Sequence, residues 1–127
     1  MALVAVVTIL ALVQYFLQGV RVGMARGKYG VEAPATTGHP VFERHFRVHQ
    51  NTLEQMIVFL PSLWLFAQFV SPRIAALLGV VFLVARFLYE RGYVEDPKKR
   101  STGAGLTAAV NGILVLGAVI GALWQLL

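Results

Sequence analysis

Four long apolar segments, separated by short polar connections, restrict the fold of this 127-residue chain more than any other feature. They cover approximately residues 2–23, 48–70, 74–93 and 104–127. An α-helix needs roughly 20 residues to cross the hydrocarbon core of a bilayer. The third segment reaches that length only if it continues past Arg86, with this arginine either buried against protein or extended to the membrane surface. The sequence therefore predicts an all-α integral membrane protein, a bundle of four transmembrane helices in a single domain, residues 1–127.

The composition supports a membrane protein and argues against a soluble domain. The chain is 57% hydrophobic and 13% charged, whereas soluble domains are about half apolar and a quarter charged. A cleaved signal peptide is the alternative interpretation of the first segment. That segment lacks a basic leading region, and its apolar run is longer than a signal peptide requires. We therefore expect it to remain as the first span.

The net charge of +5 is explained by membrane topology and does not require a nucleic acid partner. The basic residues gather around the first connection and around the end of the third span: Arg21, Arg26, Lys28, Arg44 and Arg47, then Arg86, Arg91, Lys98, Lys99 and Arg100. In a four-span protein these places lie on one side, which the positive-inside rule makes cytoplasmic, with both termini opposite. The basic groups would contact anionic lipids. Small size and the lack of an endoplasmic reticulum retrieval signal favour a bacterial inner membrane.

Cysteine is absent from the sequence, which excludes disulfides, a protein thiolate and a cysteine metal site. The three histidines, His39, His45 and His49, have no acidic or cysteine ligand at the usual spacing. No metal site is predicted, and any thiol that takes part in the chemistry must come from a substrate.

Polar side chains at the start of the second span form the first candidate site. Arg47, Asn51 and Glu54 lie at i, i+4 and i+7 and therefore share one face of the predicted helix. Ionisable groups inside a membrane are costly and are commonly functional, because lipid does not solvate them. We expect Glu54 to be buried in the bundle, and this face to be the place where chemistry occurs.

A second candidate cluster comprises Arg86, Tyr89 and Tyr93, at i, i+3 and i+7 of the third span. An interfacial aromatic belt around an extended arginine is the alternative interpretation. Together the two clusters give the basic end of the bundle arginines, an amide, a carboxylate and two tyrosines. Arginine pairs with carboxylates, and Glu54 would hold an ammonium group. This inventory suits a small zwitterionic ligand with more than one carboxylate.

Several further motifs follow one another along most of the chain. They are Ala25-Arg26, Lys28-Tyr29, the run Pro34-Ala35-Thr36-Thr37-Gly38-His39-Pro40, Phe42-Glu43-Arg44 continuing to Arg47, Asn51 and Glu54, then Ala85-Arg86, Tyr89, Gly92-Tyr93 and Lys98-Lys99-Arg100-Ser101-Thr102-Gly103. With these motifs and four spans, the chain resembles the family of membrane-associated proteins in eicosanoid and glutathione metabolism (MAPEG). The resemblance is closest to its branch of type 2 microsomal glutathione transferases and cysteinyl-leukotriene synthases.

The resemblance implies a homotrimer of four-helix subunits, with glutathione as co-substrate between neighbouring subunits and a hydrophobic electrophile entering from the bilayer. By motif position, it implies that glutathione is held by Arg26, Arg47, Asn51, Glu54, Arg86, Tyr89 and Tyr93, with His49 as a further candidate. Arg100 matches the arginine that faces the thiol in similar enzymes and is the catalytic candidate. A fixed guanidinium favours the thiolate, which then attacks the electrophile.

Three positions depart from the family pattern. Gly27 stands where the leukotriene synthase has a second arginine, His49 where the family usually has glutamine, and Gln55 where an aromatic residue commonly follows the glutamate. The predicted function is a membrane glutathione transferase, with reduction of lipid hydroperoxides as a further activity. A non-catalytic lipid-binding or scaffold member of the family is the alternative. A small multidrug transporter is a more remote alternative, because it would need an acidic residue in the first span and this chain has none there.

Overall fold

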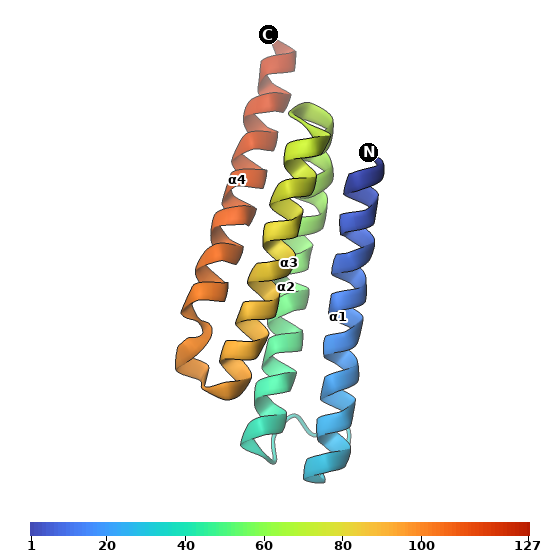
Figure 1. Ribbon diagram of the computed structural model, residues 1–127, viewed down its shortest axis with the longest axis vertical. Coiled ribbons are helices and arrows are strands. Elements are labelled where there is room, and N and C mark those ends of the chain that lie inside the picture. The colour runs from blue at the N-terminus through green and yellow to red at the C-terminus, as the bar shows by residue number, and fades with distance from the viewer.

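A computed structural model describes all residues, Met1–Leu127, and consists of four long helices joined by short connections (Figure 1). The elements are α1 (Ala2–Tyr29), α2 (Pro40–Phe69), α3 (Pro72–Glu95), the 3-10 helix η1 (Pro97–Arg100) and α4 (Ser101–Leu126). The predicted all-α, four-helix bundle is confirmed. Successive long helices run in opposite directions, so both termini lie at one end and the first and third connections at the other, which we call the basic end.

Three of the helical segments, Ala2–Tyr29, Pro72–Glu95 and Pro97–Leu126, are long and apolar enough to cross a membrane. α2 is 30 residues long but less apolar, because its first half carries the charged and amide side chains of the candidate site. Its course is fixed by its neighbours. α1 ends and α3 begins at opposite ends of the bundle, so α2 must cover the whole distance between them (Figure 1). The chain is therefore an integral membrane protein.

The helix ends coincide with residues that cap or break helices. His39 accepts a hydrogen bond from the backbone N–H of Val41 at 3.1 Å where α2 begins, and Ser71 accepts one from Ile74 at 3.3 Å where α3 begins. A proline follows each of these caps, at the position where its missing N–H costs nothing. Gly30 ends α1 with a φ of 67°, a left-handed conformation that glycine adopts without strain.

Arg44 connects α2 to the end of α3 at the basic end. Its guanidinium donates hydrogen bonds to the backbone oxygens of Val94 at 3.1 Å and Glu95 at 3.3 Å. These are the last carbonyls of α3, whose partial negative charge favours a cation. Asp96 then accepts a hydrogen bond from a backbone N–H of η1 at 3.1 Å. The short segment that carries Arg100 is therefore fixed relative to both α2 and α3.

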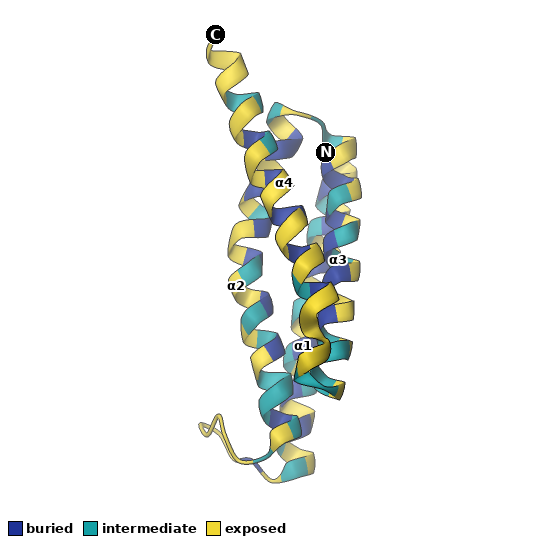
Figure 2. Cartoon of the chain, turned by 90° about the vertical axis from the view of Figure 1, so that its left-hand side faces the viewer, coloured by how far each residue is buried: buried dark blue, intermediate teal, exposed yellow.

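α2 and α3 form the inner pair of the bundle, and α1 and α4 each pack against both of them. At the centre, the rings of Phe59 and Phe82 stack at 3.7 Å and are fully buried. Most other large apolar side chains face outward, as Figure 2 shows by the exposed residues along every helix. Large exposed apolar surfaces are unfavourable in water, so this distribution fits a protein surrounded by lipid.

α3 meets η1 and the start of α4 with almost no space between backbones. A Cβ atom added to Gly103 of α4 would lie 2.6 Å from Cα of Tyr89 and 2.7 Å from the backbone oxygen of Ala85. One added to Gly92 of α3 would lie 2.5 Å from the backbone oxygen of Lys99. Such contacts with backbone atoms cannot be relieved by moving a side chain. Glycine at these two positions therefore lets the α3–η1–α4 turn close.

Candidate functional site

Arg86, on α3 near the basic end, is the centre of the polar interior. Its side chain carries a full charge, yet the residue is only 1% exposed. One terminal nitrogen donates hydrogen bonds to Asn51 Oδ1 at 2.8 Å and Thr52 Oγ1 at 2.9 Å. The other terminal nitrogen donates to Thr107 Oγ1 at 3.3 Å. Of the two alternatives that the sequence left open, burial against protein is the one that the structure shows.

No carboxylate neutralises this guanidinium. Neither of the two ion pairs in the chain includes Arg86, and its hydrogen-bond acceptors are all neutral. The guanidinium carbon lies 4.2 Å from the centre of the Tyr89 ring in a cation–π contact, and Nε has no hydrogen-bond partner. A buried charge solvated only by neutral oxygens is costly. It leaves a positive potential that favours an anion nearby.

A cavity of about 200 Å³ lies beside Arg86, between α2, α3 and the start of α4. Its lining consists of Asn51, Gln55, Arg86, Tyr89, Arg100, Ala104, Thr107 and Ala108. Arg100 reaches it from the exposed side and donates a hydrogen bond to the backbone oxygen of Pro97 at 2.9 Å. One buried and one exposed arginine thus face a small space with no acidic residue in its lining. This arrangement suits an anionic group.

Several of the predicted site residues come together at this cavity. Asn51, Arg86, Tyr89 and Arg100, which lie on α2, α3 and η1, all line it. Tyr93 lies one turn further along α3, and its ring stacks on that of Tyr89 with the centroids 5.6 Å apart. The two polar clusters predicted on separate spans therefore meet at Asn51, which lines the same cavity as Arg86 and Tyr89.

Arg47 and Glu54 share the face of α2 that carries Asn51, but both are exposed in the single subunit. Arg47 donates a hydrogen bond to Gln50 Oε1 at 3.3 Å. Glu54 forms no ion pair within the chain, and the expectation that it is buried is wrong for one subunit. The reason is geometric, because three residues along a helix turn a side chain about 60° away from Asn51 and toward the outside of the bundle.

Arg26 and His49 lie outside the cavity. Arg26, near the end of α1, donates a hydrogen bond to the backbone oxygen of Ala35 at 2.7 Å and lies 4.7 Å from the centre of the Phe42 ring. His49 faces α1, where its ring stacks on that of Tyr15 at 4.3 Å. Within one subunit, Arg26 thus organises the first connection, and His49 serves a packing contact between α1 and α2.

Two of the neutral residues that accept hydrogen bonds from Arg86, Thr52 and Thr107, were not predicted as site residues. Thr107 also donates a hydrogen bond to the backbone oxygen of Gly103 at 2.7 Å, and Asn111 donates to Gln55 Oε1 at 3.1 Å. Gly103, Thr107 and Asn111 recur every four residues and so occupy one face of α4. Two polar side chains one turn apart in an otherwise apolar span are the signal that identifies this buried face.

Comparison with known proteins covers nearly the whole chain. The MAPEG family model matches residues 4–120. An uncharacterized protein of Synechocystis sp. is 51% identical over 122 residues, covering 96% of this chain and 89% of that protein. Microsomal glutathione S-transferase 2 of Homo sapiens is 43% identical over 121 residues, covering 95% of this chain and 80% of the relative. Leukotriene C4 synthase of Bos taurus is 36% identical over 122 residues, covering 96% and 81%.

Proposed function

Because the chain belongs to the MAPEG family, we propose that it is a membrane glutathione transferase that joins the thiol of glutathione to hydrophobic electrophiles from the bilayer. The observation that carries this proposal is the cavity between Arg86 and Arg100, which offers two guanidinium groups and no carboxylate. The relative named microsomal glutathione S-transferase 2 supports the same class of reaction.

Glutathione matches the residues around the cavity by its functional groups. It has two carboxylates, one ammonium group and one thiol, and this chain has no cysteine of its own. The carboxylates suit arginine and tyrosine donors, and the unpaired Glu54 suits the ammonium group. In this proposal the tripeptide is held by Arg26, Arg47, Asn51, Glu54, Arg86, Tyr89 and Tyr93.

Arg100 would activate the thiol. A free thiol has a pKa near 8.5, so only a few per cent is thiolate at neutral pH. The positive charge of Arg100, reinforced by the unneutralised Arg86 behind it, favours the thiolate. The thiol proton passes to solvent, sulfur forms a bond to the electrophilic carbon, and the leaving group departs with its bonding electrons. Holding both reactants in place lowers the entropic part of the barrier.

A second copy of the chain would complete the site. The cavity of about 200 Å³ is smaller than the roughly 300–1,000 Å³ typical of ligand sites, and Arg26 lies outside it. Arg47 and Glu54 are exposed beside it, where a neighbouring subunit would cover them. We propose the homotrimer implied by the family resemblance, with glutathione between subunits. Cross-linking of the protein in native membranes should give trimers.

The proposed orientation places the cavity on the cytoplasmic side of a bacterial inner membrane. The basic residues cluster at the end where the cavity lies, which is the side that the positive-inside rule assigns to the cytoplasm. Accessibility of a cysteine introduced in the exposed first connection, tested in inverted and right-side-out vesicles, distinguishes the two orientations.

The test of function is conjugation of glutathione to an aryl halide by the purified full chain in detergent. Arg100→Ala should lower kcat/KM by about 10- to 100-fold, because the group that stabilises the thiolate is lost. Lys98→Ala is the matched control, since it removes one exposed positive charge from the same short helix. Its kcat/KM should stay within about twofold of the wild type.

The outcomes separate the proposed transferase from its alternatives. Glutathione binding without conjugation would redirect the assay to lipid hydroperoxides as substrates. No glutathione binding by calorimetry would contradict the proposal and indicate a non-catalytic scaffold. Equal losses in Arg100→Ala and Lys98→Ala would show that Arg100 contributes only general electrostatics.

A further inference from the structure

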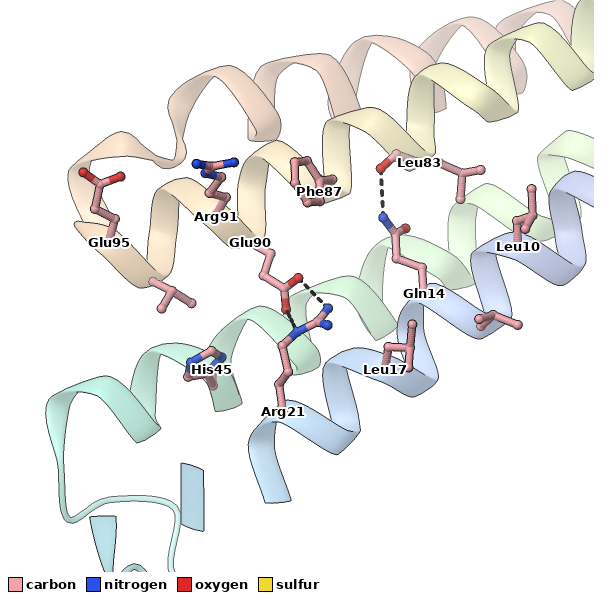
Figure 3. A pocket seen from close by; sticks show the side chains of 12 residues that line it. Leu10, Gln14, Leu17, Arg21, His45, Leu83, Phe87, Glu90, Arg91 and Glu95 are labelled. Atoms are coloured by element: carbon pink, nitrogen blue, oxygen red, sulfur yellow. Dashed lines mark hydrogen bonds and ion pairs between the residues drawn. The ribbon is translucent and has the colours of Figure 1, made fainter. Parts of the chain in front are cut away.

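A groove separate from the cavity runs between α1 and α3, and Figure 3 shows it from close by. Its volume is about 870 Å³, within the range of roughly 300–1,000 Å³ that ligand sites occupy. It lies on a different face of α3 from Arg86 and shares no lining residue with the cavity. The proposed glutathione chemistry therefore gives it no role.

The groove changes from apolar to ionic along its length. Leu10, Leu17 and Phe87 line its inner part, while Arg21 and Arg91 line its mouth at the basic end (Figure 3). From Leu10 to Arg21 the axis of α1 advances about 16 Å, at 1.5 Å per residue. This is about half of the roughly 30 Å hydrocarbon core. The groove is therefore long enough to span one leaflet, with mostly apolar walls toward the middle of the bundle and charges toward the basic end.

Positive charge remains at the mouth after the internal ion pairs are formed. Glu90 is neutralised by Arg21, which donates to its two carboxylate oxygens at 2.6 and 2.8 Å. Glu95 is paired with Lys99 at 2.7 Å. Arg91 is exposed and forms no ion pair, and Arg21 keeps guanidinium hydrogens that Glu90 does not use. The mouth therefore favours an anionic group.

We propose that this groove binds one anionic phospholipid of the leaflet on the basic side. An acyl chain lies along Leu10 and Leu17, and the phosphate is held by Arg21 and Arg91. Guanidinium groups match phosphate oxygens in geometry and charge. His45 lies beneath the ion pair (Figure 3), and its Nδ1 has no hydrogen-bond partner within the chain. A zwitterionic head group would bring its own cation toward Arg91 and binds more weakly.

Native mass spectrometry of the delipidated full chain tests the choice of head group. Phosphatidylglycerol and phosphatidylcholine with the same acyl chains are titrated separately, and one phosphatidylglycerol per subunit should be retained in preference. Arg91→Gln should weaken phosphatidylglycerol binding about fivefold, the effect of one basic group at a membrane surface. Lys28→Gln also removes a positive charge at the basic end but lies outside the groove. It should change binding by less than about twofold.

A second pair of variants tests whether the lipid binds in the α1–α3 groove. Leu17 is 45% exposed, so Leu17→Trp fills the groove without a clash in the core and should abolish the retained lipid. Leu3 is 60% exposed on the same helix outside the groove, and Leu3→Trp should retain it. Equal binding of the two lipids, equal effects of the two charge variants, or lipid retention by Leu17→Trp would overturn the proposal. None of these measurements involves glutathione, so a negative result here can be distinguished from a negative result in the transferase assay.

Discussion

The two arginine sites, which lie on different faces of α3, differ in how their charge is balanced. In the α1–α3 groove, Arg21 forms a bidentate ion pair with Glu90, and the arginine side chain is 39% exposed. At the cavity, Arg86 is 1% exposed and is bonded only to the neutral oxygens of α2 and α4. The more deeply buried charge is therefore the one without a counter-ion.

Stability alone would favour the reverse arrangement, because burying an unpaired charge costs more than burying a paired one. The charge of Arg21 is largely used within the fold to join α1 to α3. The charge of Arg86 is not neutralised within the chain and acts on whatever enters the cavity. The comparison shows that uncompensated burial of an arginine is evidence for function by itself, whereas an arginine near a membrane surface needs a second observation, such as the groove beside Arg21 and Arg91.

The largest expected effect comes from disrupting the close backbone contact between α3 and α4 beside the cavity. Gly103→Val places a branched side chain against the backbone of Tyr89, and we expect the free energy of unfolding to fall by about 3 kcal/mol. Thermal unfolding in detergent, followed by circular dichroism, measures it. Gly105→Val is the matched control, since nothing lies within 4 Å of a Cβ there, and it should change the free energy of unfolding by less than about 1 kcal/mol, because valine is no worse than glycine in a helix. Equal losses would show that the close contact is unimportant.

Replacing Arg86 tests whether its unneutralised charge contributes to ligand binding more than to stability. Arg86→Met should weaken glutathione binding by about tenfold or more, equivalent to about 1.4 kcal/mol. The free energy of unfolding should fall less than in Gly103→Val, because the removed burial cost of the charge offsets the three oxygens left without a donor. Calorimetry with glutathione and thermal unfolding separate the two effects. An unchanged Kd together with a large loss of stability would make Arg86 purely structural.

Arg21, which is paired with Glu90, should contribute to stability and not to glutathione binding. Arg21→Met should lower the free energy of unfolding by about 1 kcal/mol or more, because Glu90, whose side chain is 13% exposed, is left unpaired. The double variant Arg21→Met, Glu90→Met should cost less than the sum of the two single variants, which a double-mutant cycle measures. Strictly additive losses would mean that the pair contributes no coupling.

The smallest expected effect tests the position of His49. His49→Gln removes its stacking on Tyr15 and should lower the free energy of unfolding by about 0.5 kcal/mol. Because the ring faces α1 and not the cavity, the KM for glutathione should stay within about twofold of the wild type. A tenfold rise in KM would restore His49 as a glutathione ligand.

The fold followed from the sequence because the length and hydropathy of a span depend only on nearby residues. The polar start of α2 was the difficult part. His39 and Pro40 cap and begin this helix, so it starts well before the apolar segment that was predicted as the span. Helix ends respond to caps and prolines, whereas spans are recognised by apolar content alone.

The site was predictable only as far as helix periodicity reaches. Spacing along one helix placed Asn51 with Arg47 and Arg86 with Tyr89, but it does not say which helices meet. The contact of Arg86 with Thr107 joins residues on different helices, and no local pattern encodes it. The exposure of Glu54 likewise depends on which neighbour covers that side of α2, which is a property of the assembly and not of the segment.

The two-residue connection between α2 and α3 bears on how the chain enters the membrane. α2 is the least apolar helix, and charged side chains oppose the insertion of an isolated helix. Only Val70 and Ser71 separate it from α3, and within that hairpin Arg86 already finds Asn51 and Thr52 as acceptors. The hairpin is thus the smallest unit in which these polar groups satisfy one another. We expect α2 and α3 to enter the bilayer together, before α4 arrives to close the cavity.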